Sequence, residues 1–381
     1  MFAKIGYYFF SILLNRIFLV LPIKKDKVLF LSDVRADISG NFYFIHEAIK
    51  NRYDVRLSLK GDRRIRRSFR QWLQQCIDLA TAKYILLDDY SVSTAYIHVR
   101  KGQELVQLWH SSGAYKKFAH SRSGEHGDIK RIHAGYKRYT KTITSSNYIR
   151  ECFAEAFAIP VERVCATGIP RTDIFFDEEY KEIKKCEIYR DIPEIKNKKV
   201  ILFAPTYRGT KVEDANYGFE YFDLERLYHQ FREEYVVLIK WHPALYNNLK
   251  FGKVKGFTLD RYSGFAFDIS ESREINDYLF VTEVLITDYS SLIFDYALLK
   301  KPIVYFAYDL EKYQDGRGMY YSFDEYVYGP VARNMEQLIE GIEKQEFYEE
   351  KWQMFVKKFV EKNDGHATER TVREIFGEKR N

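Results

Sequence analysis

Short apolar runs recur along the chain, and each is followed at once by a polar turn and then by residues with helical spacing. Such runs are typical of buried strands, and their alternation with amphipathic stretches predicts parallel sheets of an α/β fold. In these sheets, ligands bind at the carboxyl ends of the strands. The polar turns are therefore the expected places for chemistry. The clearest runs are residues 27–31, 84–87, 105–108, 200–203, 236–240, 284–286 and 303–306. Further strands are expected at 141–144, before the polar turn Ser145–Ser146, and at 257–259, and residues 63–77 are a candidate for a basic helix.

The chain of 381 residues is too long for one ordinary core and suits two domains of common size. The charged stretch 177–198 is the expected connection between two similar α/β halves. We expect a separate amphipathic helix at 1–25, domains at 26–185 and 186–340, and C-terminal helices at 341–381 that pack back on the domains.

Composition narrows the classes of protein that fit. With 46% hydrophobic and 30% charged residues, the chain is globular and not disordered. A net charge of +6 favours anionic partners such as lipid headgroups or phosphorylated substrates, and it is no nucleic-acid signature. The four cysteines form no CxxC pair, which favours a reduced setting. The carboxylate pair Asp88–Asp89 lacks a DxD pattern, so we expect no required metal and no cofactor.

An apolar run at residues 5–23 predicts an N-terminal helix that is a signal peptide, a membrane span or a helix in the membrane interface. No small-residue cleavage site follows, and Asn15–Arg16 near its middle would be costly in a span. Flanking aromatic and basic residues fit an interfacial helix. Packing on the protein's own core is the alternative. The expected membrane residues are Tyr7, Tyr8, Phe9, Phe10, Lys24 and Lys25.

The polar turn at residues 287–291 follows the strand at 284–286, and apolar residues with helical spacing resume after it. A helix N-terminus carries unpaired N–H groups and positive dipole, so hydroxyls there allow a phosphate to dock. Ser290 or Ser291 could equally serve only as a helix cap.

His110 lies just past another predicted strand and is followed by small residues. A histidine in this place can act as a general base on a substrate hydroxyl. A structural histidine bonded to a loop is the alternative from the spacing alone.

Several motifs, in order, resemble those of the CDP-glycerol glycerophosphotransferase family, which builds teichoic acids and related poly(alditol phosphate) polymers. They span about residues 106–318, and the chain resembles the short, primase-type members, with a polymerase as the alternative. Ser111–Ser112 depart mildly from the residues that usually follow the motif histidine. The motifs are WHSSGAYKK, GIPRTD, ILFAPTYRG, KWHP, ITDYSSLIFDYALLKKPIVYF and YDLEKYQDGRG.

This resemblance implies a GT-B-like architecture, in which two Rossmann-type domains have parallel sheets facing a central cleft. It also implies that an alditol phosphate passes from a CDP-alditol to an acceptor hydroxyl, with release of CMP. His110 matches the general base of the acceptor domain, and His242 of KWHP matches a histidine that binds donor phosphate and could protonate the departing CMP. The residues that match donor-phosphate ligands are Thr287, Ser290, Ser291 and Arg317.

Two further residues have weaker assignments. Asp288 is expected to orient its neighbours or the donor alditol. Arg208 of TYRG is a candidate for donor-phosphate binding, with a structural ion pair as the equal alternative.

The expected function is transfer of glycerol phosphate or ribitol phosphate from CDP-glycerol or CDP-ribitol. The expected acceptor is an undecaprenyl-linked saccharide or a growing polymer, at the cytoplasmic face of the plasma membrane. The sequence is compatible with an oligomer, and its short length suits a primase. The alternatives are a nucleotide-sugar-dependent GT-B glycosyltransferase and a membrane-associated scaffold with a decayed α/β core. The intact set of motif residues speaks against the scaffold.

Overall fold

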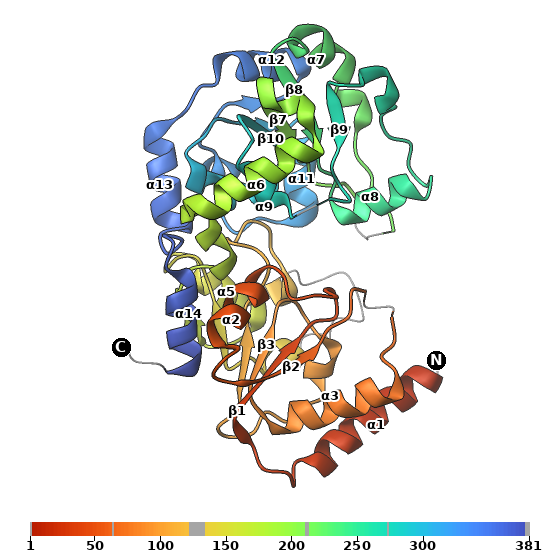
Figure 1. Ribbon diagram of the computed structural model, residues 1–381, viewed down its shortest axis with the longest axis vertical. Coiled ribbons are helices and arrows are strands. Elements are labelled where there is room, and N and C mark those ends of the chain that lie inside the picture. Colours follow the sequence, from red (N-terminus) through yellow and green to blue (C-terminus); the bar gives the residue numbers. More distant parts are fainter. Residues whose placement is uncertain (1, 63–64, 122–133, 210–212, 273, 378–381) are drawn as a thin grey trace. The chain divides into compact units, whose positions relative to one another are not determined.

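A computed structural model describes residues 2–62, 65–121, 134–209, 213–272 and 274–377 of the protein (Figure 1). The chain divides into two compact units, which we describe separately. Unit 1 comprises Met1–Phe176 and Lys358–Asn381, and unit 2 comprises Asp177–Lys357. The expected boundary at 185/186 lies inside helix α6 (Glu178–Asp191), and the expected segment 341–381 is shared between the units.

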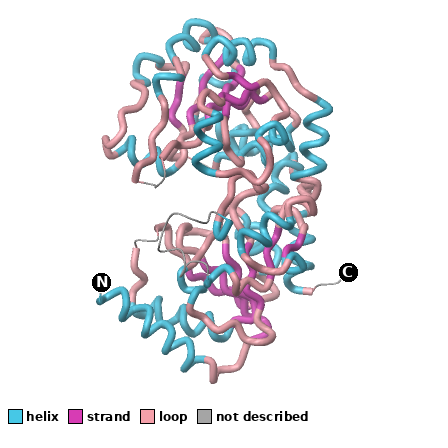
Figure 2. The backbone as a smooth tube through the Cα atoms, turned by 180° about the vertical axis from the view of Figure 1, so that it is seen from behind, coloured by secondary structure: helices cyan, strands magenta, loops and turns pink. Residues whose placement is uncertain are grey.

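Unit 1 is built on a sheet of six parallel strands in the order β2-β1-β3-β4-β5-β6. The chain runs outward from β1 to β2, then returns to the other side of β1 for β3 and the following strands. Figure 2 shows the strands in the interior and the helices around them. The strands are β1 (Lys24–Leu31), β2 (Asp54–Ser58), β3 (Ala82–Leu87), β4 (Glu104–Gln107), β5 (Lys141–Ile143) and β6 (Val164–Cys165).

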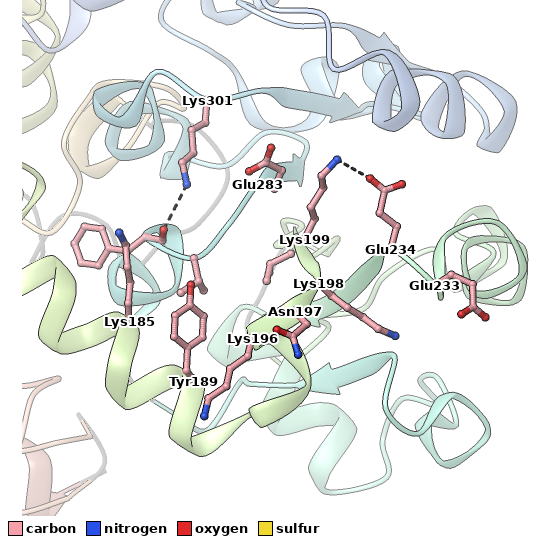
Figure 3. A pocket seen from close by; sticks show the side chains of 13 residues that line it. Lys185, Tyr189, Lys196, Asn197, Lys198, Lys199, Glu233, Glu234, Glu283 and Lys301 are labelled. Atoms are coloured by element: carbon pink, nitrogen blue, oxygen red, sulfur yellow. Dashed lines mark hydrogen bonds and ion pairs between the residues drawn. The ribbon is translucent and has the colours of Figure 1, made fainter.

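Unit 2 repeats this plan with six parallel strands in the order β12-β11-β10-β7-β8-β9. Because all strands point the same way, the residues that precede them gather at one edge of the sheet. A pocket opens at that edge (Figure 3). The strands are β7 (Lys199–Phe203), β8 (Tyr235–Ile239), β9 (Ala266–Asp268), β10 (Val284–Thr287), β11 (Ile303–Phe306) and β12 (Val331–Ala332).

Helices follow most strands, as parallel connections require. Those of unit 1 are α1 (Phe2–Phe18), α2 (Asn41–Ile49), α3 (Phe69–Thr81), α5 (Arg150–Phe157) and α14 (Ala367–Phe376). Unit 2 contains α6, α7 (Leu224–Phe231), α8 (Pro243–Lys250), α9 (Ile275–Leu279), α10 (Leu292–Tyr296), α11 (Leu310–Arg317) and α12 (Met335–Lys344). The last of its helices, α13 (Glu349–Phe359), extends across the boundary at Lys357.

Two sequence-based expectations are wrong in detail. Of the basic helix expected over residues 63–77, the described residues 65–68 are not helical, and α3 begins at Phe69, where Ser68 and Gln71 form a capping box. The strand expected at 257–259 is absent: Phe257 packs against the rings of Phe219 and Trp241, and the edge of the sheet is β9. The apolar character of this segment therefore reflects packing on the core and not pairing in a sheet.

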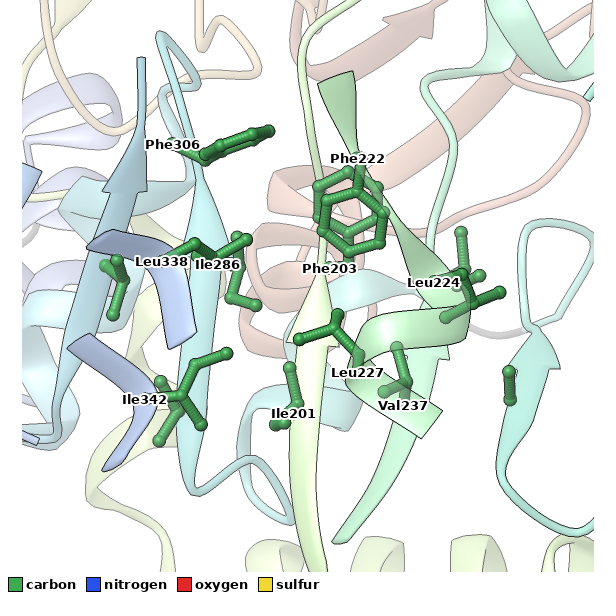
Figure 4. Close-up of a cluster of buried hydrophobic side chains, with 14 of the residues drawn as sticks. Ile201, Phe203, Phe222, Leu224, Leu227, Val237, Ile286, Phe306, Leu338 and Ile342 are labelled. Carbon is green, nitrogen blue, oxygen red and sulfur yellow. The ribbon is translucent and has the colours of Figure 1, made fainter. Parts of the chain in front are cut away.

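The core of unit 2 lies between the sheet and helices α7 and α12 (Figure 4). Phe203 and Phe222 stack with ring centroids 3.8 Å apart, and Leu338 and Ile342 of α12 belong to the same buried cluster. This interdigitation fixes the strands from which the polar turns extend.

Unit 1 is completed by the end of the chain. Val372, Ile375 and Phe376 of α14 enter its core, next to Phe30 and Tyr84. The expected ligand-binding turn after β5 instead holds this returning segment: Ser145 Oγ donates to the Phe359 carbonyl at 2.6 Å and Ser146 Oγ to the Lys358 carbonyl at 2.5 Å.

The GIPRTD motif also receives the returning segment. Gly168 has φ of +86°, and a Cβ there would come within 2.1 Å of the Lys362 carbonyl oxygen. Asp173 accepts hydrogen bonds from the backbone N–H groups of Ala367 and Thr368, which caps α14. Only glycine suits the first position.

Helix α1 packs on α3 by one side (Figure 1). Apolar residues on its other side are exposed. Trp72 Nε1 donates to Ser11 Oγ at 2.9 Å, and Asn15 Oδ1 accepts from the His98 N–H at 3.2 Å. The exposed residues of α1 are Phe9, Phe10, Ile12, Leu13 and Ile17, and Val20, just beyond the helix, is also exposed. Among the described residues, no helix is both long and apolar enough to cross a bilayer.

Candidate functional site

Each sheet has one point at which the strand order reverses. In unit 1 this point lies between β1 and β3, and in unit 2 it lies between β7 and β10. In open α/β sheets, ligands bind beyond the carboxyl ends of the strands at such points. The polar turns after these four strands, and after their neighbours β4 and β8, are the candidate sites.

In unit 1, His110 is positioned by a strained turn after β4. Trp109 adopts φ of +57°, which is costly for a bulky residue, and its buried ring stacks on Phe118 at 5.0 Å. Asn41, the first residue of α2, donates to the carbonyls of Leu108 and Trp109 at 3.2 and 2.9 Å. The turn is therefore held from two sides, and His110 follows it with a solvent-exposed side chain.

The surroundings of His110 favour a neutral imidazole. Desolvation by the surrounding protein lowers the pKa of His110, and the Arg171 guanidinium lowers it further. The Asp89 carboxylate and a hydrogen bond to the Asp88 backbone oppose this shift. Because the imidazole keeps contact with solvent, desolvation is incomplete; the direction of the shift still leaves it neutral, and able to accept a proton, at neutral pH.

Buried carboxylates lie beside this histidine, at the ends of β1 and β3. Asp33 is paired with Arg67 at 2.8 Å and Lys60 at 3.5 Å. Burial alone would raise the pKa of Asp33, but Arg67, Ser91 and Lys60 hold it below its usual value.

Asp88 is less well compensated. Its Oδ2 contacts Ser32 Oγ and Arg35 Nε, both at 3.1 Å, whereas its Oδ1 has no hydrogen-bond partner among the described residues. Burial raises the pKa of Asp88 to about 6.

In unit 2, Ser290 and Ser291 follow β10 and precede α10. Both are half-buried; Ser290 Oγ accepts from the Leu292 N–H at 3.2 Å, and Ser291 makes no side-chain capping bond. Thr287 is fully buried, and its hydroxyl donates to the Ala204 carbonyl at 2.7 Å. The structure thus places the two serines at the surface and Thr287 behind them.

Asp288 binds its protein neighbours with both oxygens. Its Oδ1 accepts from Thr206 N and Oγ1 and from Tyr289 N at 2.6–2.8 Å, and its Oδ2 accepts from Arg208 Nη1 at 2.8 Å. These contacts tie the turn after β10 to the turn after β7, on either side of the reversal point.

Arg208 occupies the centre of this arrangement. Besides Asp288, it contacts both oxygens of Asp309 at 2.7 and 2.8 Å. Burial would lower the pKa of Arg208, but the two carboxylates hold it above its usual value. Four tyrosine rings lie 5.1–5.6 Å from its guanidinium carbon: Tyr217, Tyr289, Tyr308 and Tyr313.

His242 is the N-cap of α8, in the turn after β8. Its Nδ1 accepts from the Ala244 N–H at 3.2 Å, so the proton of the neutral ring lies on Nε2. The side chain is exposed and its ring lies 4.7 Å from that of Tyr207. The ring thus presents a donor at the surface.

The side chains of some predicted site residues are not described by the structure. Arg317 is the last residue of α11, but its side chain is not described, and the same holds for the side chains of Tyr7 and Tyr8 in α1. Across the ranges that the structure does describe, no three His, Cys, Asp or Glu side chains group as metal ligands would.

Sequence reasoning missed Asn41 and Arg171. Asn41 Oδ1 accepts from the Arg171 N–H at 3.0 Å, and Arg171 Nη2 donates to Ser112 Oγ at 3.2 Å. These bonds connect the WHSSG and GIPRTD motifs. The only signal in the sequence was the arginine within GIPRTD, since Asn41 belongs to no motif.

Comparison with known proteins identifies the family. The chain matches the model of CDP-glycerol:poly(glycerophosphate) glycerophosphotransferases over residues 13–377. It is 42% identical, over 94% of its length, to a teichoic acid poly(ribitol-phosphate) polymerase of Bacillus spizizenii, of which it spans 57%. It is 37% identical, again over 94% of its length, to the teichoic acid ribitol-phosphate polymerase TarK of Staphylococcus aureus, of which it spans 70%.

The structure is similar to that of the wall teichoic acid polymerase TagF, with a TM-score of 0.76 and 23% identity over 96% of this chain and 93% of that one. This likeness and the two parallel sheets confirm the predicted GT-B-like α/β fold. The family match covers nearly the whole chain and includes every motif from which the family was predicted. The chain therefore belongs to the CDP-glycerol:poly(glycerophosphate) glycerophosphotransferase family.

Proposed function

We propose that the protein transfers an alditol phosphate from a CDP-alditol to a hydroxyl of a lipid-linked acceptor, in the synthesis of teichoic acid or a related polymer. CMP is the second product. The observation that carries this proposal is the family match over residues 13–377, together with His110, Ser290 and Ser291 at strand ends beside the reversal points. Ribitol phosphate is the first candidate, since both relatives compared above are named for it. Glycerol phosphate is the second.

The donor phosphates would bind in unit 2. Ser290, Ser291 and the N-terminal N–H groups of α10 offer neutral donors, and His242 offers Nε2–H. Arg317 is the proposed cation of this site. Arg208 has the weaker claim, because Asp288 and Asp309 already bind its guanidinium. We therefore propose that Arg208 and Asp288 hold the two turns in register, and that the exposed groups bind the phosphates.

The acceptor would be activated by His110 of unit 1. The neutral imidazole takes the proton of the acceptor hydroxyl as its oxygen bonds to the alditol-bearing phosphorus. The bond from this phosphorus to CMP breaks, and His242 can supply a proton to the departing phosphate. Phosphoryl transfer depends on positioning and charge stabilisation, so a rigid turn at His110 suits this role.

A donor screen tests the proposal. The full chain is incubated with a lipid-linked disaccharide and with CDP-ribitol, CDP-glycerol or UDP-sugars in parallel. CMP should be released from a CDP-alditol, with the acceptor gaining one or more alditol phosphates by mass. Release of UDP instead would support the glycosyltransferase alternative, and no release from any donor would support the scaffold.

We further propose that α1 binds the membrane surface as a peripheral anchor. Its apolar side is exposed although the opposite side is bonded to the unit; Phe9 is 61% and Phe10 54% exposed. A contiguous apolar surface beside Arg16, Lys24 and Lys25 fits the interface of an anionic bilayer.

Vesicle binding tests the anchor. Phe9→Ser/Phe10→Ser should reduce co-sedimentation with anionic vesicles about tenfold or more, since each buried aromatic contributes about 1.5–3 kcal/mol. The matched control is Phe251→Ser, which changes a phenylalanine that is 72% exposed in unit 2. Equal binding of the double variant and the control would refute the anchor.

A further inference from the structure

A pocket of about 660 Å³ lies in unit 2 at the amino ends of the strands, the edge opposite the turns of the donor site (Figure 3). Its walls come from segments that precede strands: Lys199 at the start of β7, Glu234 before β8, Glu283 before β10 and Lys301 before β11. Helix α6 closes another side with Lys185. The pocket therefore lies apart from the residues assigned to the transfer.

Cations outnumber anions in this pocket. Five lysines line it against three glutamates, an excess of two positive charges. The lysines come from three separate segments, so that the charge surrounds the space and is not confined to one helix face. They are Lys185, Lys196, Lys198, Lys199 and Lys301, and the glutamates are Glu233, Glu234 and Glu283.

Protein contacts compensate part of this charge: Lys185 pairs at 2.8 Å with Glu182, which lies outside the pocket lining. Lys301 Nζ donates to the carbonyls of Thr282 and Phe280 at 2.6 and 3.4 Å and has no carboxylate partner among the described residues. Burial lowers the pKa of Lys301 and Lys185 lowers it further, against the effect of Glu283.

The other lysines do little to change this balance. Lys198 Nζ donates to the Arg232 carbonyl at 2.6 Å, and the pair of Lys199 with Glu234, at 2.5 Å, is exposed and worth little (Figure 3). An anion in the pocket would supply the missing charge.

The size and the mixture of groups narrow the ligand. A volume of about 660 Å³ equals that of roughly twenty water molecules, far more than one phosphate needs. Ammonium groups bind phosphates as point charges, and carboxylates accept hydrogen bonds from hydroxyls. Lysines and glutamates side by side thus suit a chain in which phosphates alternate with polyols, and the glutamates repel a polyanion without hydroxyls.

We propose that this pocket binds a segment of poly(alditol phosphate), the polymer that the transferase extends. The inference rests on the proposed function. A chain held there would remain on the enzyme between transfers, so the pocket would increase the length of the product without taking part in the reaction.

Direct binding tests the pocket without turnover. A fluorescently labelled oligo(ribitol phosphate) is titrated with the full chain, with Lys196→Glu/Lys199→Glu and with Lys301→Gln, which retains a donor for the carbonyls. Both variants should bind the oligomer about tenfold more weakly than the wild type. The matched control is Lys253→Glu/Lys255→Glu, two exposed lysines outside the pocket with the same change in net charge.

The outcomes separate this inference from its rivals. Equal losses in the control would mean that net charge alone governs binding, and competition by CMP would make the pocket a nucleotide site. Inorganic polyphosphate of equal charge that binds as tightly would refute the polyol requirement. Each of these results overturns the inference.

Turnover separates the inference from the proposed function. The pocket variants should release CMP at the wild-type rate with a short acceptor but make shorter chains. If the wild type releases no CMP, the proposed function fails. If it does and the variants bind the oligomer normally, only the pocket assignment fails.

Discussion

The two units share one topology but arrange charge in opposite ways. At the reversal point of unit 1, Asp88 has a raised pKa and a buried oxygen with no hydrogen-bond partner in the described part of the chain, and His110 lies beside it with a lowered pKa. At the reversal point of unit 2, the Arg208 guanidinium is bound by two carboxylates. Unit 1 thus leaves Asp88 poorly compensated, whereas in unit 2 each of the two carboxylates is paired with the same guanidinium.

This difference fits the two tasks that we propose for the units. Groups that exchange protons need pKa values near the working pH, which incomplete compensation provides. The proposed phosphate site needs fixed donors, and the ion pairs of Arg208 tie together the turns from which Ser290 and Ser291 extend. Substitutions at three positions test this difference between the units.

The largest effect is expected at His110. His110→Ala should reduce transfer about 10²–10⁴-fold, because the general base is lost, while CDP-alditol binds normally to unit 2. CMP release and calorimetric titration of the donor measure the two effects. His98→Ala, an exposed histidine of the same unit, is the control. Full turnover in His110→Ala would remove the histidine from the mechanism.

Arg208 should affect stability more than donor affinity. Arg208→Met leaves Asp288, which is 1% exposed, without its cation, so the free energy of unfolding should fall by about 3–5 kcal/mol. Arg226→Met, at an exposed pair with Glu336, should change it by about 1 kcal/mol or less. Urea denaturation measures both variants. Stability like that of the control, with donor binding lost, would show that Arg208 binds phosphate instead.

Titration of Asp88 should make the stability of the fold depend on pH. Its pKa is about 6 when folded against 3.8 when unfolded, so the folded state binds the proton more tightly and loses stability as pH rises between these values. The loss amounts to up to about 3 kcal/mol above pH 6. Relative to the wild type, Asp88→Asn should therefore gain stability from pH 4 to pH 7, as followed by thermal unfolding.

The control for this effect is Asp54→Asn, at an exposed pair with Arg56. Exposed pairs contribute little, so its difference from the wild type should stay small across the pH range. A constant difference between Asp88→Asn and the wild type would mean that the Asp88 carboxylate is ionised throughout that range.

The fold could be predicted from the sequence because several of the buried parallel strands are continuous runs of apolar residues. Runs such as 200–203 and 236–239 are continuously apolar, and they form β7 and β8 as expected. The failure at 257–259 has the opposite origin: Phe257 is apolar because it packs under aromatic rings, and periodicity cannot separate this from pairing in a sheet.

Less of the candidate site could be predicted from the sequence, since the site depends on contacts between residues far apart in the chain. Motif spacing drew attention to His110 and Ser290, but nothing near Asn41 in sequence indicates that it holds the turn before His110, 69 residues away. Likewise, the sequence suggests that Ser145 and Ser146 bind a ligand. In the structure, both hydroxyls donate to carbonyls of the returning C-terminal segment. The roles of the site residues in catalysis stay predictions.

The return of the chain to unit 1 also orders events during synthesis. Residues 177–357 are complete on the ribosome before α14, whose Phe376 fills the core beside Tyr84, has been made. Unit 2 can therefore fold before α14 is available to complete the core of unit 1. The half made first is finished last, and until then its apolar face needs shielding from other nascent chains.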